Sequence, residues 1–317
     1  MKKILCVLMS CLLFVMAGCS GHSKNLKFGA ADIGGVYYSF ASTFTQLADK
    51  EIDGYTFETK TTAGSVANLR LISDGYIDLA IVQADLLSDA YNATGTFADK
   101  KYQKGYKAVA SLYTECCQIV VRKDSGGIDD LINKTVSVGA SESGTEKNAE
   151  QILKMSGITD ELINKVNMDY TEAAEKLKAG EIDAFFCTAG TRTEVIGQLS
   201  KECDICLISL DDKCIDKMLS AYSLCEKYTI PAGTYNGQDS DVTTIGVKAV
   251  LIAKQSLSDD VIKNVTKTIY EHADDFKYAT SLDISFDINT AADGVDIPFH
   301  SGAAAYYTER GINVLTE

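Results

Sequence analysis

One order of predicted secondary structure occurs twice in this chain, and this repeat constrains the fold more than any other feature of the sequence. Residues 26–82 and residues 135–186 each predict a strand, a helix, a second strand, a second helix and a buried strand. Gly75-Tyr-Ile-Asp78 and Gly180-Glu-Ile-Asp183 precede the last strand of each unit at matching places. Each unit is therefore expected to form a mostly parallel sheet covered by helices, although units of this kind are common and small identities also arise by chance.

Hydrophobic periodicity sets the expected limits of the elements. Strands are expected over 26–30, 55–60, 77–82, 135–140, 166–170, 182–186 and 243–252. Helices are expected from Ser65 to Gly75, over 171–179, over 261–276 and around Phe40 to Ala48 and Ala149 to Leu153, with a further amphipathic segment over 218–228. Two open sheets need two connections, which are expected near 113–115 and near 228–241.

Residues 1–18 predict a cleavable secretory signal peptide, because Lys2 and Lys3 precede an apolar run that is short for a membrane-spanning helix. Met16-Ala-Gly-Cys19 resembles a bacterial lipobox, in which the Cys is acylated and becomes the new N-terminus. Residues 19–25 then form a lipid-anchored tether, and the protein is expected outside the cytoplasm, anchored to the cell membrane by lipidation of Cys19. The alternatives are an ordinary signal peptide with a chance Cys, or an uncleaved anchor.

The remaining length, about three hundred residues, is enough for two lobes that each have a core. The net charge of −14 becomes −16 once Lys2 and Lys3 are removed. A chain this acidic will not hold a nucleic-acid backbone through non-specific contacts, so no nucleic-acid partner is expected.

Seven cysteines remain after the signal peptide and the lipidation site, and an odd number cannot pair completely within one chain. Cys203-Asp-Ile-Cys206 raises the alternative of a zinc or redox site. A zinc site needs a second pair of ligands, and the chain has only three His residues. Ordinary apolar packing is the favoured interpretation, with no metal and no cofactor.

Ligands of open parallel sheets bind beyond the carboxyl ends of the strands, where helices begin. Loops at four such places predict a binding site between two lobes. The candidate residues are Gly34, Gly35, Val36, Tyr37, Ser65, Gln83, Ser143, Gly144, Thr145, Thr188, Gly190 and Arg192. Glycines and helix starts present backbone N–H groups that suit a carboxylate.

Several candidates also have purely structural interpretations. Ser65 is expected to cap its own helix, and Ser143 with Glu146 fits a capping box. Arg192 either pairs with a second carboxylate of the ligand or is a solvated charge. His300 is expected to be a structural hydrogen-bonding residue.

Several short motifs, in the same order along the chain, resemble the TAXI family of substrate-binding receptors. The motifs are Gly34-Gly-Val-Tyr-Tyr38, Thr62-Ala-Gly-Ser-Val66, Gln83-Ala-Asp85, Ser143-Gly-Thr145, Asp183-Ala-Phe-Phe186 and Pro298-Phe-His-Ser-Gly-Ala303. TAXI receptors serve tripartite ATP-independent periplasmic (TRAP) transporters. The resemblance covers nearly the whole chain after the signal peptide.

The resemblance implies an α/β fold of the type II periplasmic-binding-protein class, with two lobes of mostly parallel sheet, a hinge and a central ligand cleft. Lobe I is expected to contain residues 26–112 and 236–317, and lobe II residues 113–235. The implied ligand is a small carboxylated solute, such as glutamate, glutamine or a related organic acid. The implied partners are TRAP permease subunits, and the protein itself is expected to be a monomer.

An enzyme is not expected, because no Ser-His or Cys-His signature, phosphate-binding loop or metal-ligand cluster accompanies the predicted cleft. The alternative function is a lipoprotein that senses a ligand and signals to a membrane partner without transport.

Overall fold

The computed structural model describes residues 23–99, 105–122, 126–281 and 286–317. The predicted signal peptide and the predicted lipidation site Cys19 lie outside the described residues. Lys24 and Asn25, which the predicted tether includes, already belong to strand β1 (Lys24–Gly29). None of the helices in the described ranges is both long and apolar enough to cross a membrane.

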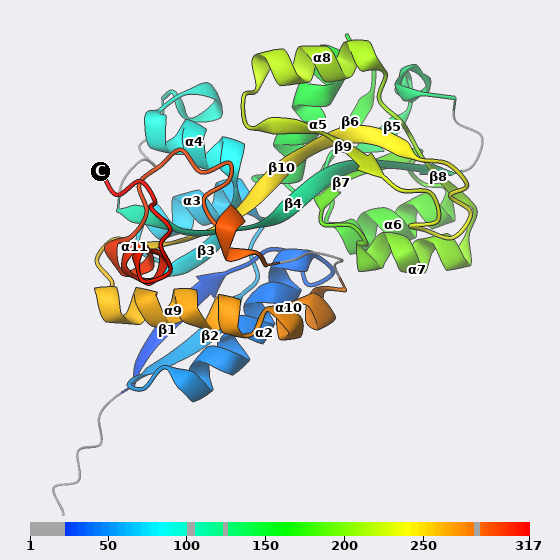
Figure 1. Cartoon of the computed structure of the whole chain (residues 1–317). Helices are drawn as coiled ribbons and strands as arrows, with labels where there is room; N and C mark the ends of the chain where they lie inside the picture. Colours follow the sequence, from blue (N-terminus) through cyan, green and yellow to red (C-terminus); the bar gives the residue numbers. More distant parts are fainter. Residues whose placement is uncertain (1–22, 100–104, 123–125, 282–285) are drawn as a thin grey trace, which may run out of the picture.

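The first repeat unit folds into parallel strands with intervening helices (Figure 1). Its elements are β1, α2 (Val36–Glu51), β2 (Tyr55–Lys60), α3 (Ser65–Ser73), β3 (Leu79–Gln83) and α4 (Ala84–Asn92), followed by the short 3-10 helix η1 (Gly95–Phe97). Strand β1 lies between β2 and β3 and is parallel to both.

The second repeat unit has the same organisation. Its elements are η2 (Ile128–Leu131), β5 (Thr135–Ser137), α5 (Gly144–Met155), β6 (Asn164–Val166), α6 (Tyr170–Ala179) and β7 (Ala184–Ala189). Strand β5 is parallel to β6 and β7. The elements α7 (Glu194–Glu202), β8 (Ile205–Leu207), α8 (Asp212–Ala221) and β9 (Cys225–Ile230) follow.

The two units are joined by the long antiparallel strands β4 (Tyr106–Arg122) and β10 (Val242–Lys254), which run diagonally through the molecule in Figure 1. The sheet order is β2-β1-β3-β10-β4-β7-β5-β6, with β8 beside β4 and β9 beside β10. The first half of β10 pairs with β9, and the second half pairs with β3. The chain therefore passes between the two halves within two strands of one sheet, whereas two sheets were expected.

The C-terminal helices cover the first half of the sheet. They are α9 (Asp259–Glu271), α10 (Ala273–Thr280), η3 (Ile288–Thr290) and α11 (Ser301–Thr308). Phe276 of α10 stacks on Phe40 of α2 with ring centroids 4.4 Å apart, which fixes these helices against each other. The predicted lobe limits place one boundary inside β4 and the other between β9 and β10, and the lobe division stays a prediction.

Several expected elements have different limits in the structure, among them the strand over 135–140, which ends at Ser137 as β5. The strand expected over 166–170 is wrong, because β6 ends at Val166 and Asp169 caps helix α6, its side chain accepting the Glu172 N–H. The amphipathic segment over 218–228 is divided into the end of α8 and strand β9. The helix over 261–276 is interrupted at His272, which has a non-helical backbone between α9 and α10.

The structure confirms the equivalence of the two Gly-x-Ile-Asp motifs. The Asp78 carboxylate accepts the Lys27 N–H at 2.9 Å, and the Asp78 N–H donates to the Lys27 carbonyl at 2.8 Å. Asp183 makes the same pair of bonds with Thr135, both at 2.9 Å. Each Asp therefore joins the start of its buried strand to the first strand of its own unit.

Asn68 of α3 holds the carboxyl edge of the first unit together. Its side chain is fully buried and donates to the carbonyls of Ala30 at 2.6 Å and Ile81 at 2.9 Å. It also accepts the hydroxyl of Thr62 at 2.8 Å. One side chain thus connects two strands and the loop between β2 and α3.

Replacing Asn68 by Ala is expected to lower the free energy of unfolding by about 2 to 4 kcal/mol, because buried carbonyls lose their donors. Urea unfolding of the purified protein measures this change. The matched control is Asn25→Ala, at an exposed position of β1, which is expected to change stability by less than about 0.5 kcal/mol. Equal effects of the two substitutions would contradict the role given to Asn68.

Candidate ligand-binding site

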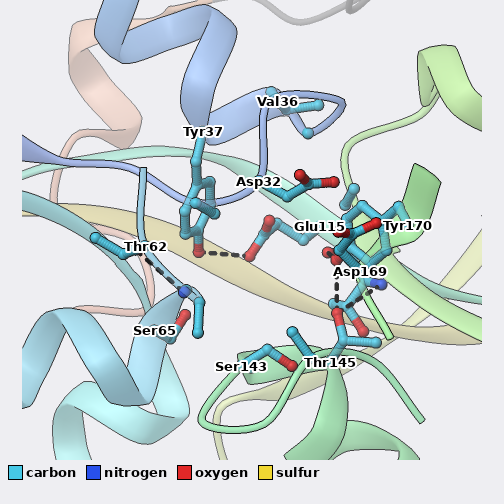
Figure 2. Close-up of a pocket in the computed structure, with 18 of the residues that line it drawn as sticks. Asp32, Val36, Tyr37, Thr62, Ser65, Glu115, Ser143, Thr145, Asp169 and Tyr170 are labelled. Carbon is cyan, nitrogen blue, oxygen red and sulfur yellow. Dashed lines mark hydrogen bonds between the residues drawn. The ribbon is translucent and has the colours of Figure 1, made fainter. Parts of the chain in front are cut away.

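A cavity of about 290 Å³ lies where the two repeat units face each other (Figure 2). The first unit contributes Ala31, Asp32, Ile33, Gly35, Val36, Tyr37, Thr61, Thr62, Ala63, Gly64, Ser65 and Gln83 to its lining. The opposite wall consists of Glu115, Ala140, Ser143, Gly144, Thr145, Asp169, Tyr170, Thr188 and Ala189. The cavity is thus at the carboxyl ends of the parallel strands, as open α/β sheets predict.

Five helices begin at this cavity. Their N-cap residues, which all line it, are Gly35 for α2, Gly64 for α3, Gln83 for α4, Ser143 for α5 and Asp169 for α6. The first N–H groups of a helix have no partner within the helix, and the helix dipole favours negative charge there. The cavity wall therefore offers several places for a carboxylate.

Carboxyl groups also line the cavity, namely Asp32, Glu115 and Asp169, and no Lys, Arg or His is among the described lining residues. Glu115 is only 2% exposed, and its carboxylate accepts the Tyr37 hydroxyl at 2.8 Å. Burial raises the pKa of Glu115 from 4.5 to about 8. Burial, and then the charge of Asp169, raises the pKa of Asp32.

Three buried acceptor atoms on the cavity wall have no hydrogen-bond partner within the described part of the chain. They are Asp32 Oδ2, Gln83 Oε1 and Thr188 Oγ1. A buried polar atom without a partner costs free energy, so these atoms suit a ligand that donates hydrogen bonds.

The Tyr170 hydroxyl connects two segments of the second unit at the cavity. It donates to the Thr188 carbonyl at 2.9 Å and lies 2.6 Å from Thr145 Oγ1. Because its one proton goes to Thr188, the Thr145 hydroxyl must donate to Tyr170. Thr145 Oγ1 in turn accepts the Thr188 N–H at 3.2 Å, so its lone pairs are partly occupied before a ligand arrives.

Contacts between the two units close the cavity. The Ala67 N–H donates to the Glu142 carbonyl at 3.1 Å, and Arg70 pairs with the Glu142 carboxylate at 2.6 Å. A Cβ on Gly144 would lie 2.3 Å from Gln83 Oε1, so the start of α5 touches the opposite wall. The structure therefore describes a closed arrangement.

The structure brings nine of the twelve predicted site residues together at the cavity. They are Gly35, Val36, Tyr37, Ser65, Gln83, Ser143, Gly144, Thr145 and Thr188. Ligand binding by these residues stays a prediction. The sequence predicted that Ser65 caps α3, and this prediction is wrong. Its hydroxyl instead accepts the Gln83 N–H at 3.1 Å. Ser143 does cap α5 through the Glu146 N–H, while the Glu146 carboxylate accepts from Glu142 instead of Ser143.

Gly34, Gly190 and Arg192 are not part of the cavity lining. Gly190 is buried and its carbonyl accepts the Thr193 hydroxyl at 3.0 Å. Arg192 is exposed and lines a separate hollow with Tyr228 and Pro231. A pairing of Arg192 with a ligand in the main cavity is therefore unsupported.

The structural role expected for His300 is confirmed. Its side chain is 2% exposed and caps α11, Nδ1 accepting the Gly302 N–H at 3.2 Å. The seven cysteines of the described segments are all unpaired thiols. Within those segments no three metal-ligating side chains are grouped to hold an ion.

The acidic residues of the cavity were missed in the sequence. Asp32 precedes the predicted Gly34-Gly35 loop. Asp169 was assigned to a strand, although an Asp directly before a helix is a typical N-cap residue and would have indicated its position. Glu115 lies in the middle of a long strand, and no local pattern distinguishes it from other strand residues.

The Glu115 carboxyl predicts a pH dependence of stability. The folded protein keeps a proton that the unfolded chain releases above about pH 4.5, so the free energy of unfolding falls between about pH 4.5 and about pH 8. Glu115→Gln removes this loss. Its stability relative to the natural protein is expected to rise by on the order of 3 kcal/mol from pH 5 to pH 8.

Urea unfolding at the two pH values measures this difference. Asp85, whose pKa is raised by burial to about 6, is present in both proteins, and its contribution largely cancels. Glu161→Gln, at an exposed position, serves as the control and is expected to show no such change. A constant difference between Glu115→Gln and the natural protein would refute the buried, protonated state.

Comparisons with known proteins agree with this fold. Periplasmic binding protein BugD aligns with a TM-score of 0.54 and 11% identity, over 81% of this chain and 85% of BugD. A putative L-cystine ABC transporter from Listeria monocytogenes aligns with a TM-score of 0.52 and 14% identity, over 81% of this chain and 94% of that chain. The ligand-binding component of an ABC-type import system from Staphylococcus aureus gives 0.50 and 12%, over 92% and 94%.

At these identities the likeness establishes the fold alone, which is the α/β fold of type II periplasmic binding proteins that the sequence predicts. A family model matches residues 28–311, which include both repeat units and both long strands. The chain belongs to the NMT1-like family.

Proposed function

We propose that this chain is an extracytoplasmic receptor that encloses a small amino acid of the glutamine or glutamate kind and delivers it to a TRAP-type permease. The observation that carries the proposal is the composition of the closed cavity, where helix N-termini and carboxyl groups, among them the buried Glu115, face the same space. A solute with both a carboxylate and an ammonium group matches both features.

The carboxylate of the solute is assigned to the starts of α5 and α2. At α5, the Gly144 and Thr145 N–H groups lie in the first turn, after the cap residue Ser143. At α2, Val36 and Tyr37 occupy the same positions after Gly35, which has no side-chain cap. Backbone N–H groups and the helix dipole bind a carboxylate without a cationic side chain.

The ammonium group is assigned to the acidic side of the cavity. Asp32, Glu115 and the unpartnered Gln83 Oε1 can all accept hydrogen bonds from a ligand there. A simple dicarboxylate would place a second negative charge beside these groups, with no lining cation to offset it. The cavity therefore favours an amino acid over an organic acid without an amine.

Transport is supported by the fold and by the resemblance of the motifs. Of the proteins that share the fold, one is named as a putative ABC transporter and another as the ligand-binding component of an ABC-type import system. The TRAP partner rests on the TAXI-like motifs from Gly34 to Ala303, and the lipid anchor rests on the lipobox before Cys19. Sensing without transport would use the same cavity, and uptake of the solute by cells that carry this protein together with a TRAP-type permease distinguishes the two.

A selective stabilisation by amino acids is expected in thermal unfolding of the purified protein. A solute at one hundred times its Kd adds about 2.7 kcal/mol, which raises the Tm by several degrees. The panel contains the common amino acids, their desamino analogues and dicarboxylates. The chain has no Trp, so calorimetry reports the transition. Failure of every solute, after unfolding and refolding to remove any retained ligand, would refute the receptor function.

Gly144→Ala is expected to weaken binding of the stabilising solute by about tenfold or more. The added Cβ meets the Gln83 amide of the opposite wall and displaces it from the closed arrangement, a typical cost of overpacking. The matched control is Gly197→Ala in α7, where an added Cβ meets nothing within 4 Å. Titration calorimetry gives both Kd values, and equal values would argue against closure at Gly144.

A further inference from the structure

Glu115 lies at the point of the sheet where the neighbours of strand β4 change. It lies on β4 opposite Val247 of β10, just before β4 begins to pair with β7 at Cys116. Its side chain lines the cavity and points toward the Tyr37 hydroxyl (Figure 2). The neighbouring residue Thr114 points to the other face of β4, as strand geometry requires.

No cationic side chain compensates Glu115 within the described residues. The ionisable groups that face it are Tyr37 of α2, Tyr113 and Cys116 of β4, Tyr170 of α6 and Asp85 of α4. Each of these side chains is neutral when protonated and negative when ionised, so none of them can offset a negative charge on Glu115. Lys248 of the adjacent strand β10 bonds instead to Thr114 at 2.9 Å and lies 3.9 Å from Glu226.

The surroundings of Glu115 contain acceptors that lack donors. Gln83 Oε1 and the Tyr113 hydroxyl are both buried without a partner in the described structure. Burial raises the pKa of Glu115 to about 8, so the empty cavity holds this carboxyl in its protonated form at neutral pH. Of the two unpartnered acceptors, Gln83 lines the cavity, so an ammonium group entering it would find the unpaired Gln83 Oε1 and one carboxyl able to ionise.

We propose that Glu115 selects solutes that carry an ammonium group, and that the bound ammonium causes the Glu115 carboxyl to release its proton to the solvent. This inference rests on the proposed function as an amino-acid receptor. The balance is simple: the solute keeps all its protons, Glu115 changes from a carboxylic acid to a carboxylate, and one proton passes to the buffer. The product is a buried ion pair in place of a buried neutral acid.

A linkage between binding and pH follows. Below about pH 8, affinity for the amino acid is expected to rise by up to about tenfold per pH unit, because the proton must leave before the ion pair forms. Above about pH 8 the affinity levels off. A desamino analogue gains nothing from an ionised Glu115, so its binding releases no proton.

Titration calorimetry in buffers of small and large ionisation enthalpy counts the released protons. The first pair of probes is L-glutamine and glutaramate, which differ only in the α-amino group, or the most stabilising amino acid of the thermal panel with its own desamino analogue. The amino acid is expected to release about one proton at pH 7 and about one half at pH 8, where its own amino group is still almost fully protonated. The desamino analogue is expected to bind at least about tenfold more weakly at pH 8 and to release none.

The matched variants are Glu115→Gln and Asp85→Asn. Gln at position 115 keeps an acceptor for the Tyr37 hydroxyl but cannot ionise, so proton release should vanish and the preference for the amino acid should fall by about tenfold. Asp85 is a second buried carboxyl, with its pKa raised to about 6, but it does not line the cavity. Its Asn variant is expected to retain proton release.

Equal affinities for the amino acid and its desamino analogue, or binding of the amino acid without proton release, would overturn the inference while leaving the receptor function intact. Loss of proton release in Asp85→Asn but not in Glu115→Gln would assign the proton to Asp85 and also overturn it. Failure of all solutes to bind would instead refute the receptor function itself. Should Glu115→Gln not fold, the natural protein and Asp85→Asn still test the inference: no proton release in the natural protein, or loss of release in Asp85→Asn, would overturn it.

Discussion

The structure depends on two long strands that belong to both halves of the molecule. β4 and β10 pair with each other along most of their length. Part of the way along, β10 exchanges β9 for β3, and β4 begins to pair with β7. Because both halves share these strands, the carboxyl ends of the two parallel units face the same space. A residue in the middle of β4, Glu115, therefore becomes part of the cavity wall although no loop carries it there.

Two opposing electrostatic preferences meet in this space. Five helix N-termini favour negative charge, while Asp32, Glu115 and Asp169 favour positive charge or hydrogen-bond donors. The preference for positive charge is not satisfied by the lining itself, since the described lining residues contain no cation, whereas the Asp169 carboxylate already accepts the Glu172 N–H at the start of α6. A zwitterion would satisfy both at once, which is the physical basis for proposing an amino acid as the ligand of a cavity without Arg or Lys.

Much of the fold follows from local patterns, because the two units repeat motifs whose physical role is local. Asp78 and Asp183 bind the first strand of their own units, and the glycines before them end helices, so short windows of sequence predict both. The continuous sheet depends on pairing between distant strands, which periodicity does not encode. Glu115 and Arg192 illustrate the same limit at the site: one lies mid-strand yet reaches the cavity, and the other follows a predicted cleft loop yet points to solvent.

The contacts that close the cavity are weak by themselves. Arg70 and Glu142 are about one third or more exposed, and an exposed ion pair contributes roughly 0 to 1 kcal/mol. The close approach of Gly144 to Gln83 adds contact area but no hydrogen bond that would hold the halves together. The backbone bond from the Ala67 N–H to the Glu142 carbonyl lies at the same contact. In the proposed receptor, the solute would add the hydrogen bonds that the buried acceptors of the cavity lack, so that ligand binding and closure are one event.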